Sequence, residues 1–187
     1  NSLLRDEMSE ENILLASADP GVLQEGDIQI EKFPSSKELA EYDLFIIGAV
    51  TSSFFKSSEA LDIRDAVEKR GTGVIFIPGS QEIAASYRNT PFEPLIPVKL
   101  VEEQDYSIFT EERPFQPFKL SIPKEHRDHP VFQLADDPEI NERIWKLLPE
   151  FYSYVKTGGI KPGKTILATY PFSGRGEKDV IMASGYY

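Results

Sequence analysis

Cysteine is absent from the chain of 187 residues, and histidine occurs only twice, as His126 and His129. Without a thiol the chain forms no disulfide, offers no thiolate to a metal ion and has no cysteine nucleophile. A serine triad or a histidine metal site would have to use one of the two histidines. The lack of cysteine leaves the cellular compartment open, because such a chain suits oxidising and reducing surroundings equally.

The sequence also lacks a long apolar run and an excess of positive charge. No apolar stretch reaches the roughly 18 residues of a membrane-spanning helix and no signal peptide pattern occurs, so we expect no direct membrane insertion by this sequence. The 20 Lys and Arg residues are outnumbered by 31 Asp and Glu, which gives a formal net charge of −11. Binding to a nucleic acid requires a basic stripe, and the basic residues are scattered, so nucleic acid is excluded as a partner.

What remains is the composition of a globular domain. Hydrophobic residues make up 40% and charged residues 27%, which supplies both a core and a polar surface. A chain of 187 residues is long enough for one substantial core. Because it begins with Asn1-Ser2 and not with an initiator methionine, we expect residues 1–187 to be a single domain within a longer chain.

The most informative stretch, from Tyr42 to Gln81, predicts a strand, a crossover helix and a second strand. Its two nearly continuous apolar runs, 44–50 and 74–77, are typical of strands that are buried on both faces of a parallel sheet. A glycine, Gly48 or Gly79, marks the loop at each strand end. In open α/β sheets, ligands and catalytic groups collect at the carboxyl ends of the strands. We therefore expect any functional site beside these two loops.

The helix between the strands is expected to begin after an N-cap at Ser57 or Ser58, with Glu59 in its first turn. Its inward-facing residues recur at helical spacing and are Ala60, Ile63, Ala66 and Val67. Gly71 then ends the helix.

Shorter elements are expected on both sides of this unit. Further strands are predicted at 13–18, 28–33, 99–108, 119–122, 151–155, 165–170 and 179–184. The last two are expected to pair antiparallel, and Gly158-Gly159 is predicted to be a turn. Asp137 as N-cap and Pro138 at the first helical position predict a helix that carries Trp145 into the core.

The second strand-end loop, Pro78-Gly79-Ser80-Gln81, lies where a nucleophile elbow would lie. An elbow needs small residues on both sides of the nucleophile. Here Gly79 directly precedes Ser80, but Glu82 stands where the second small residue should be. A loop serine that forms hydrogen bonds with its own backbone surroundings therefore fits Ser80 better than a nucleophile does.

The first strand-end loop offers Gly48, Ser52 and Ser53. Its backbone N–H groups and hydroxyls suit an oxyanion or another anion, and they equally suit a turn with a cluster of N-cap residues. Tyr87 and Arg88 follow the second loop, where an aromatic ring and a guanidinium suit a sugar or a carboxylate, or pack over the sheet edge.

Other polar residues carry weaker signals. Asp19 lies in the turn after the first predicted strand and completes the candidate cleft. His126 and His129 are three residues apart in a loop, where no third metal ligand is indicated by spacing. The pair Asp136-Asp137 resembles an acid/base pair, but its position before a proline favours helix capping.

Taken in order, several motifs resemble the class I glutamine amidotransferase-like domains of large bacterial membrane-anchored proteins, many of which also carry von Willebrand factor type A modules. The motifs are ILLASADPG, QEGD, YDLFIIGAV, GTGVIFIPGSQ, YRNTPFEPLIPV and HPVFQL followed by IWKLLP. The resemblance covers most of the chain. It implies an α/β fold of the flavodoxin-like type, a three-layer sandwich with a mostly parallel central sheet, to which the last strands add an antiparallel portion.

In active members of that family, the region matching loop 48–53 supplies the oxyanion hole, and the turn matching Ile77-Pro78-Gly79 holds the nucleophilic cysteine. This chain has no cysteine and no H-x-E motif. Glutamine hydrolysis through a thioester is therefore excluded, because an acyl intermediate needs a nucleophile.

The sequence thus predicts a non-catalytic binding or interaction module of a larger bacterial envelope protein, with no cofactor and with a protein or small ligand as partner. One alternative is a hydrolase or sugar-modifying enzyme that uses Ser80, Glu82, Arg88 and a histidine in the same cleft; a histidine within hydrogen-bond reach of Ser80 would favour it. Another is a spacer or oligomerisation unit, which would show a broad apolar patch and no polar cleft.

Overall fold

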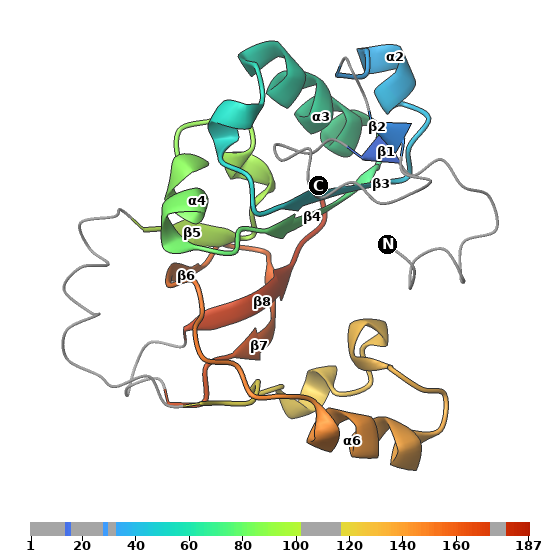
Figure 1. Ribbon diagram of the computed structural model, residues 1–187, viewed down its shortest axis with the longest axis vertical. Helices are drawn as coiled ribbons and strands as arrows, with labels where there is room; N and C mark the ends of the chain where they lie inside the picture. The colour runs from blue at the N-terminus through green and yellow to red at the C-terminus, as the bar shows by residue number, and fades with distance from the viewer. Residues whose placement is uncertain (1–13, 16–27, 30–32, 102–116, 173–178) are drawn as a thin grey trace.

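The computed structural model describes residues 14–15, 28–29, 33–101, 117–172 and 179–187. Within them it is an α/β protein that mixes helices with both parallel and antiparallel strand pairs. Figure 1 shows two parts along the long axis, one built on β3, β4 and their helices and the other on β7, β8 and α6, with β5 and β6 between them. No helix in the described residues is both long enough and apolar enough to cross a membrane.

The strand–helix–strand unit predicted from the sequence is confirmed. Strand β3 (Leu44–Gly48) pairs in parallel with β4 (Gly73–Ile77), and α3 (Ser57–Arg70) crosses between them. The N-cap of α3 is Lys56 and not a serine, because the Glu59 carboxylate accepts a hydrogen bond from the Lys56 backbone N–H at 2.8 Å. Gly71 ends the helix with φ of 81°, a conformation that favours glycine.

The main core lies between α3 and one face of these strands. The predicted inward stripe of α3 is buried and consists of Ala60, Ile63, Ala66 and Val67. Phe92 is fully buried beside it and makes edge contacts with Phe55 and Tyr87, at ring-centroid distances of 5.0 and 5.6 Å. Aromatic packing of this kind adds stabilisation beyond the buried area.

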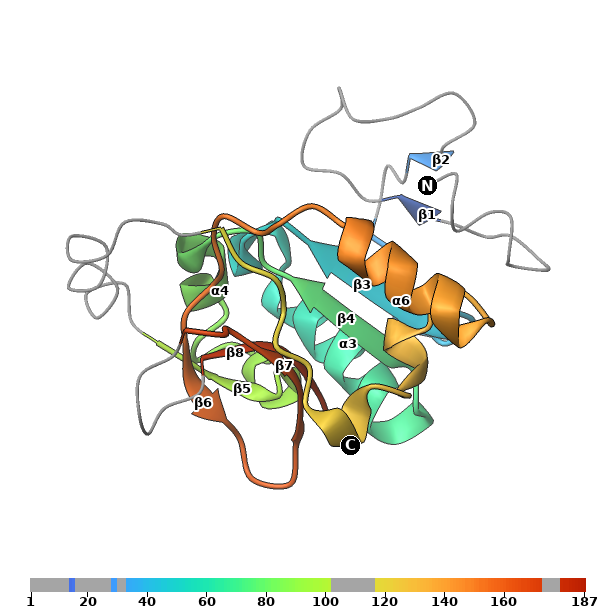
Figure 2. The ribbon, with the colours of Figure 1, turned by 90° about the horizontal axis from the view of Figure 1, so that it is seen from below.

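The prediction that β3 and β4 are buried on both faces is wrong. Residues of the strands that face α3 pack into the core, but those on the opposite face are exposed: Leu44 by 42%, Ile46 by 49%, Ile75 by 45% and Ile77 by 54%. We call these four residues the open face. Figure 2 shows β3 and β4 side by side with α3 behind them; α6 overlaps them in that view but lies at the other end of the molecule in Figure 1.

Short elements surround this unit. Helix α2 (Ser36–Leu39) begins at the Ser35 N-cap, whose backbone N–H donates to the Glu38 carboxylate at 2.7 Å. Helix α4 (Gln81–Ser86) follows β4, and a 3₁₀ turn covers Glu93–Leu95. Strands β1 (Leu14–Leu15) and β2 (Ile28–Gln29) pair in parallel. Of the strands predicted at 13–18 and 28–33, residues 13, 16–18 and 30–32 lie outside the described residues, and Phe33 is not part of a strand.

Two antiparallel pairs complete the described strands. Strand β5 (Val98–Leu100) pairs with β6 (Thr157–Ile160), and β7 (Thr165–Thr169) pairs with β8 (Val180–Ser184), which confirms the predicted last pair. In the described residues the four pairs remain separate two-stranded sheets. The predicted turn at Gly158-Gly159 is wrong, because both glycines lie within β6. A Cβ atom on Gly158 would lie 3.2 Å from the Lys99 Cβ, so a glycine lets β5 approach closely.

Two other predicted strands, 119–122 and 151–155, are also corrected. Their described residues form isolated antiparallel bridges, from Phe118 to Phe151 and from Ser121 to Thr169. A strand needs a neighbour in register over several residues, and a single bridge does not supply one. The predicted strand at 99–108 is described only as far as residue 101, and its remainder lies outside the described residues.

Helix α6 (Pro138–Leu147) is confirmed, with Asp137 as its N-cap. Two 3₁₀ turns precede it, at Lys124–His126 and Pro130–Phe132. Trp145 packs against a second, smaller core centred on Phe132, Leu167 and Ala168. Its indole N–H donates to the Phe132 carbonyl at 2.7 Å, which satisfies the polar atom of the ring.

Candidate functional site

The structure brings the two strand-end loops together. The Ala49 backbone N–H, just after β3, donates to the Ile77 carbonyl at the end of β4 at 2.8 Å. A Cβ atom on Gly79 would lie 3.5 Å from the Ala49 Cβ. Ala49 and Gly79 have φ of 51° and 72°, so both loops turn through the left-handed region, which is uncommon for alanine. The tight contact leaves the loops packed against each other.

The polar groups of the first loop are engaged in internal hydrogen bonds. The Ser52 backbone N–H donates to the Ser86 hydroxyl at 2.9 Å, and the Ser52 hydroxyl donates to the Ser86 carbonyl at 2.5 Å. The hydroxyls of Ser53 and Thr51 are 2.7 Å apart and bond to each other. The loop therefore uses its Ser52 donors to hold α4 in place, and these donors are not directed at a bound anion.

Tyr87 lies in the core and not in a cleft. Only 2% of its surface is exposed, and its hydroxyl donates to the Val50 carbonyl at 2.7 Å. Burial raises the pKa of the Tyr87 hydroxyl to about 12, because the phenolate would lose its hydration. Arg88, the next residue, is half-buried, and its backbone N–H donates to the Ala85 carbonyl at 3.1 Å.

The second loop is used in the same way. Pro78 accepts a hydrogen bond from the Ser80 backbone N–H at 2.8 Å, and the Ser80 hydroxyl caps α4 by accepting from the Ile83 N–H at 3.3 Å. Gln81 is buried and makes two bonds to the Lys156 backbone: its amide donates to the carbonyl at 3.2 Å and accepts from the N–H at 2.8 Å. Asp19, the remaining predicted cleft residue, lies outside the described residues.

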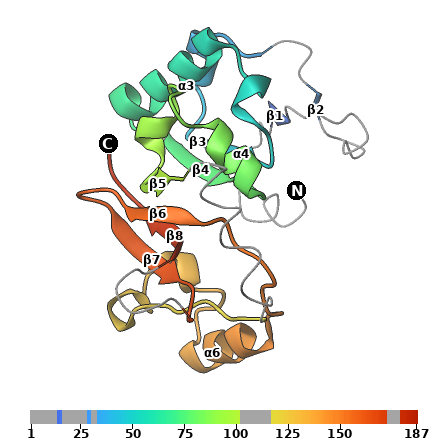
Figure 3. The same cartoon turned by 90° about the vertical axis from the view of Figure 1, so that its left-hand side faces the viewer.

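Both histidines are remote from Ser80. They belong to segment 124–132, drawn in yellow, which Figures 1 and 3 place at the opposite end of the molecule from α4. The Nδ1 atom of His129 accepts a hydrogen bond from the Val131 N–H at 3.2 Å, so this ring caps a turn. Within the described ranges, no group of three or more His, Asp or Glu side chains is arranged to hold a metal ion.

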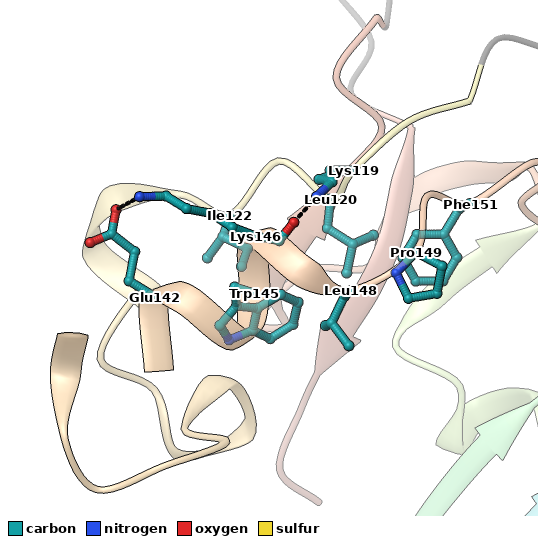
Figure 4. Close-up of a pocket in the computed structure, with 9 residues that line it drawn as sticks. All are labelled: Lys119, Leu120, Ile122, Glu142, Trp145, Lys146, Leu148, Pro149 and Phe151. Carbon is teal, nitrogen blue, oxygen red and sulfur yellow. Dashed lines mark hydrogen bonds and ion pairs between the residues drawn. The ribbon is translucent and has the colours of Figure 1, made fainter. Parts of the chain in front are cut away.

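A pocket lies in the second part of the molecule, between α6 and segment 119–122 (Figure 4). Its volume is about 290 Å³, and its lining consists of Lys119, Leu120, Ile122, Glu142, Trp145, Lys146, Leu148, Pro149 and Phe151. The sequence analysis missed this pocket. Its walls come from segments 119–122 and 142–151, which are separated in the chain, and the local signal was the amphipathic pattern of α6.

The walls of the pocket are mostly apolar, and each of its three charged side chains has a polar partner. The Lys119 ammonium donates to the Lys146 carbonyl at 2.6 Å, and the Lys146 ammonium lies 2.8 Å from the Glu142 carboxylate. The hydrogen bond from Lys146 lowers the pKa of the Glu142 carboxyl. Six of the nine lining residues are apolar, so the pocket is suited to contact with an apolar group.

Comparison of the chain with family models, with curated proteins and with solved structures found no match. The described residues place the protein in the α/β class, with two strand-end loops packed against each other.

Proposed function

We propose that this protein is a non-catalytic binding or interaction module of the class I glutamine amidotransferase-like type, within a larger bacterial envelope protein. One observation carries the proposal: the predicted cleft residues use their polar groups for internal structure. Ser52 and Tyr87 tie the first loop to α4, while Ser80 and Gln81 cap and anchor that helix.

The family assignment has geometric support at the second loop. In this unit a parallel strand, β4, leads through Gly79 in the left-handed region directly into α4, which is the arrangement of a nucleophile elbow. The finer fold, a flavodoxin-like three-layer sandwich with a parallel central sheet, is part of the proposal. The parallel pair β3 and β4 with α3 on one face supplies two of its layers, and a helix on the open face would supply the third.

Chemistry argues against the alternative of a hydrolase or sugar-modifying enzyme. Acyl transfer by a serine needs a base within hydrogen-bond reach of its hydroxyl. The Ser80 hydroxyl instead accepts a bond from the Ile83 N–H, and the segment that carries both histidines is at the far end of the molecule.

The test is an activity assay of the protein and its Ser80→Ala variant. Ammonia release from glutamine and hydrolysis of p-nitrophenyl esters and glycosides should stay at the buffer rate for both proteins. Circular dichroism of the variant controls for folding, because Ser80 also caps α4. Turnover by the protein that disappears in the variant would overturn the proposal and support the hydrolase.

The envelope assignment needs a separate measurement, because it concerns the full-length gene product. We expect that product to fractionate with membranes from its native cell. Recovery of the full-length product entirely in the cytoplasmic fraction would contradict this part of the proposal.

A further inference from the structure

The open face of β3 and β4 forms one continuous apolar surface. In the strand register Ile46 lies beside Ile75, while Leu44 lies beside Gly73 and Ile77 beside Gly48. A Cβ atom on Gly73 would be 3.1 Å from the Leu44 Cδ1, so Leu44 leans over that glycine and closes the surface at its amino end. A Cβ atom on Gly48 would meet nothing within 4 Å, so the space beside Ile77 is open.

The dimensions of the open face fit one α-helix. Two neighbouring strands are about 10 Å wide, close to the diameter of a helix with its side chains. The five residues of each strand span about 16 Å, a length that about 11 helical residues match. The opposite face of the same strands already packs against a helical stripe, that of α3. Parallel sheets are normally covered by helices on both faces.

Charge favours a basic partner. The chain has a formal net charge of −11, and the exposed residues Glu41 and Asp43 directly precede the open face at the amino end of β3. Such a field attracts a helix whose polar side carries lysine or arginine, and it repels acidic peptides and anionic membrane surfaces.

We propose that the open face is a docking surface for an amphipathic α-helix of a partner protein, with an aliphatic stripe against Leu44, Ile46, Ile75 and Ile77 and basic residues on its polar side. This inference rests on the proposed function as an interaction module and names its surface and the chemistry of its partner.

The probe is a synthetic helical peptide of about 14 residues with a leucine stripe at i, i+3, i+4 and i+7, lysines elsewhere and a terminal fluorophore. Its matched controls are a peptide of the same composition with the stripe scrambled, and one with glutamates in place of the lysines. Binding is measured by fluorescence anisotropy against the protein, the Ile46→Thr/Ile75→Thr variant and the control variant Leu147→Gln. Threonine retains strand propensity, and Leu147 is an exposed apolar residue on α6.

We expect the leucine–lysine peptide to bind the protein and to bind the double variant at least about tenfold more weakly, because two aliphatic contacts are lost. The affinity of Leu147→Gln for the peptide should stay within about twofold of that of the unmodified protein. The scrambled and glutamate peptides should bind at least about tenfold more weakly. Raising the salt from about 50 to about 500 mM should weaken binding severalfold. Thermal unfolding of each variant checks its fold, and Ile77→Thr at the strand end replaces the double variant if that variant unfolds.

Equal binding of the protein and the folded open-face variant would overturn the proposal, as would equal binding of the striped and scrambled peptides. If the protein self-associates and the open-face substitutions abolish this self-association, the face binds a second copy of the chain, and the proposal of a partner helix is overturned. Binding to phosphatidylcholine–phosphatidylserine vesicles that the same substitutions abolish would assign it to a membrane. None of these outcomes changes the activity assay with Ser80→Ala, so failure of the docking proposal is distinguishable from failure of the proposed function.

Discussion

At the scale of single residues, the polar side chains near the strand ends are structural ties. Tyr87 is the clearest case, because its ring belongs to the main core and its hydroxyl holds the Val50 carbonyl of the first loop. Ala49, one residue earlier, adopts a left-handed backbone that the surrounding contacts must stabilise. The loop therefore depends on bonds from α4 for its conformation.

The hydroxyl of Tyr87 should make stability depend on pH in the alkaline range. Its pKa is raised from 10.0 to about 12 in the folded protein. As the pH rises above the unfolded value, the unfolded chain releases a proton that the folded protein retains, so the free energy of unfolding falls by up to about 1.4 kcal/mol per pH unit. Below that pH the contribution is constant.

Tyr87→Phe removes this contribution together with the bond to Val50. We expect the variant to be about 1 kcal/mol less stable than the protein at neutral pH, and the difference to narrow above about pH 10. Urea unfolding from about pH 8 to about pH 11.5 measures the difference in the free energy of unfolding and its change with pH. Tyr187, whose pKa is also raised to about 12, affects both proteins alike. A constant difference over the whole range would contradict the prediction.

At the scale of elements, each helix is positioned by its first turn and by the face that it buries. Helix α3 begins where Glu59 reaches back to Lys56, and it buries an apolar stripe against β3 and β4. Helix α6 begins where the Asp137 carboxylate accepts bonds from the N–H groups of Glu139 and Ile140, both at 2.9 Å.

Removal of the α6 cap should lower stability measurably. We expect Asp137→Ala to reduce the free energy of unfolding by about 1 kcal/mol, since two backbone donors and a favourable charge at the helix N-terminus are lost. Asp136→Ala is the matched control, one residue earlier and exposed, and should change stability by less than about 0.5 kcal/mol. Urea unfolding followed by Trp145 fluorescence compares them, and equal losses would contradict the capping role.

At the scale of the whole molecule, several connections join the two cores within the described residues. Pairing of β5 with β6 is one connection, and the two hydrogen bonds between the Gln81 side chain and the Lys156 backbone are another. Trp145, the single tryptophan, packs on the second core, so its fluorescence reports that part alone.

Gln81→Leu should weaken the coupling between the two parts. It removes the two hydrogen bonds between the Gln81 side chain and the Lys156 backbone, which should lower stability by about 1 to 3 kcal/mol. Urea transitions followed by Trp145 fluorescence and by far-ultraviolet circular dichroism should coincide for the protein and separate for the variant. Glu82→Gln, at an exposed neighbouring position, should leave both transitions unchanged. Coincident transitions in Gln81→Leu would show that the remaining connections suffice for coupling; these include the pairing of β5 with β6 and the bond from the Lys161 ammonium to the Glu93 carbonyl.

Local signals in the sequence determined the helices α3 and α6, the crossover between β3 and β4, and the antiparallel pair of β7 and β8. Capping residues, apolar spacing and glycine stops act within a few neighbouring residues, so they can be recognised without knowing the fold. The same signals placed the two strand-end loops next to each other, because parallel strands end at the same edge.

Only the tertiary structure decided what those elements face. An apolar run cannot distinguish a strand covered on both faces from one that leaves Ile46 and Ile75 open, because coverage depends on distant segments. Gly158 lies within β6 and not in a turn, because a residue without a side chain lets β5 approach closely there. The Ser52 N–H donates to the hydroxyl of Ser86, 34 residues away. Whether the donors of Ser52 were available for a ligand therefore depended on a long-range contact. The sequence located the candidate site, and the fold decided how its polar groups are used.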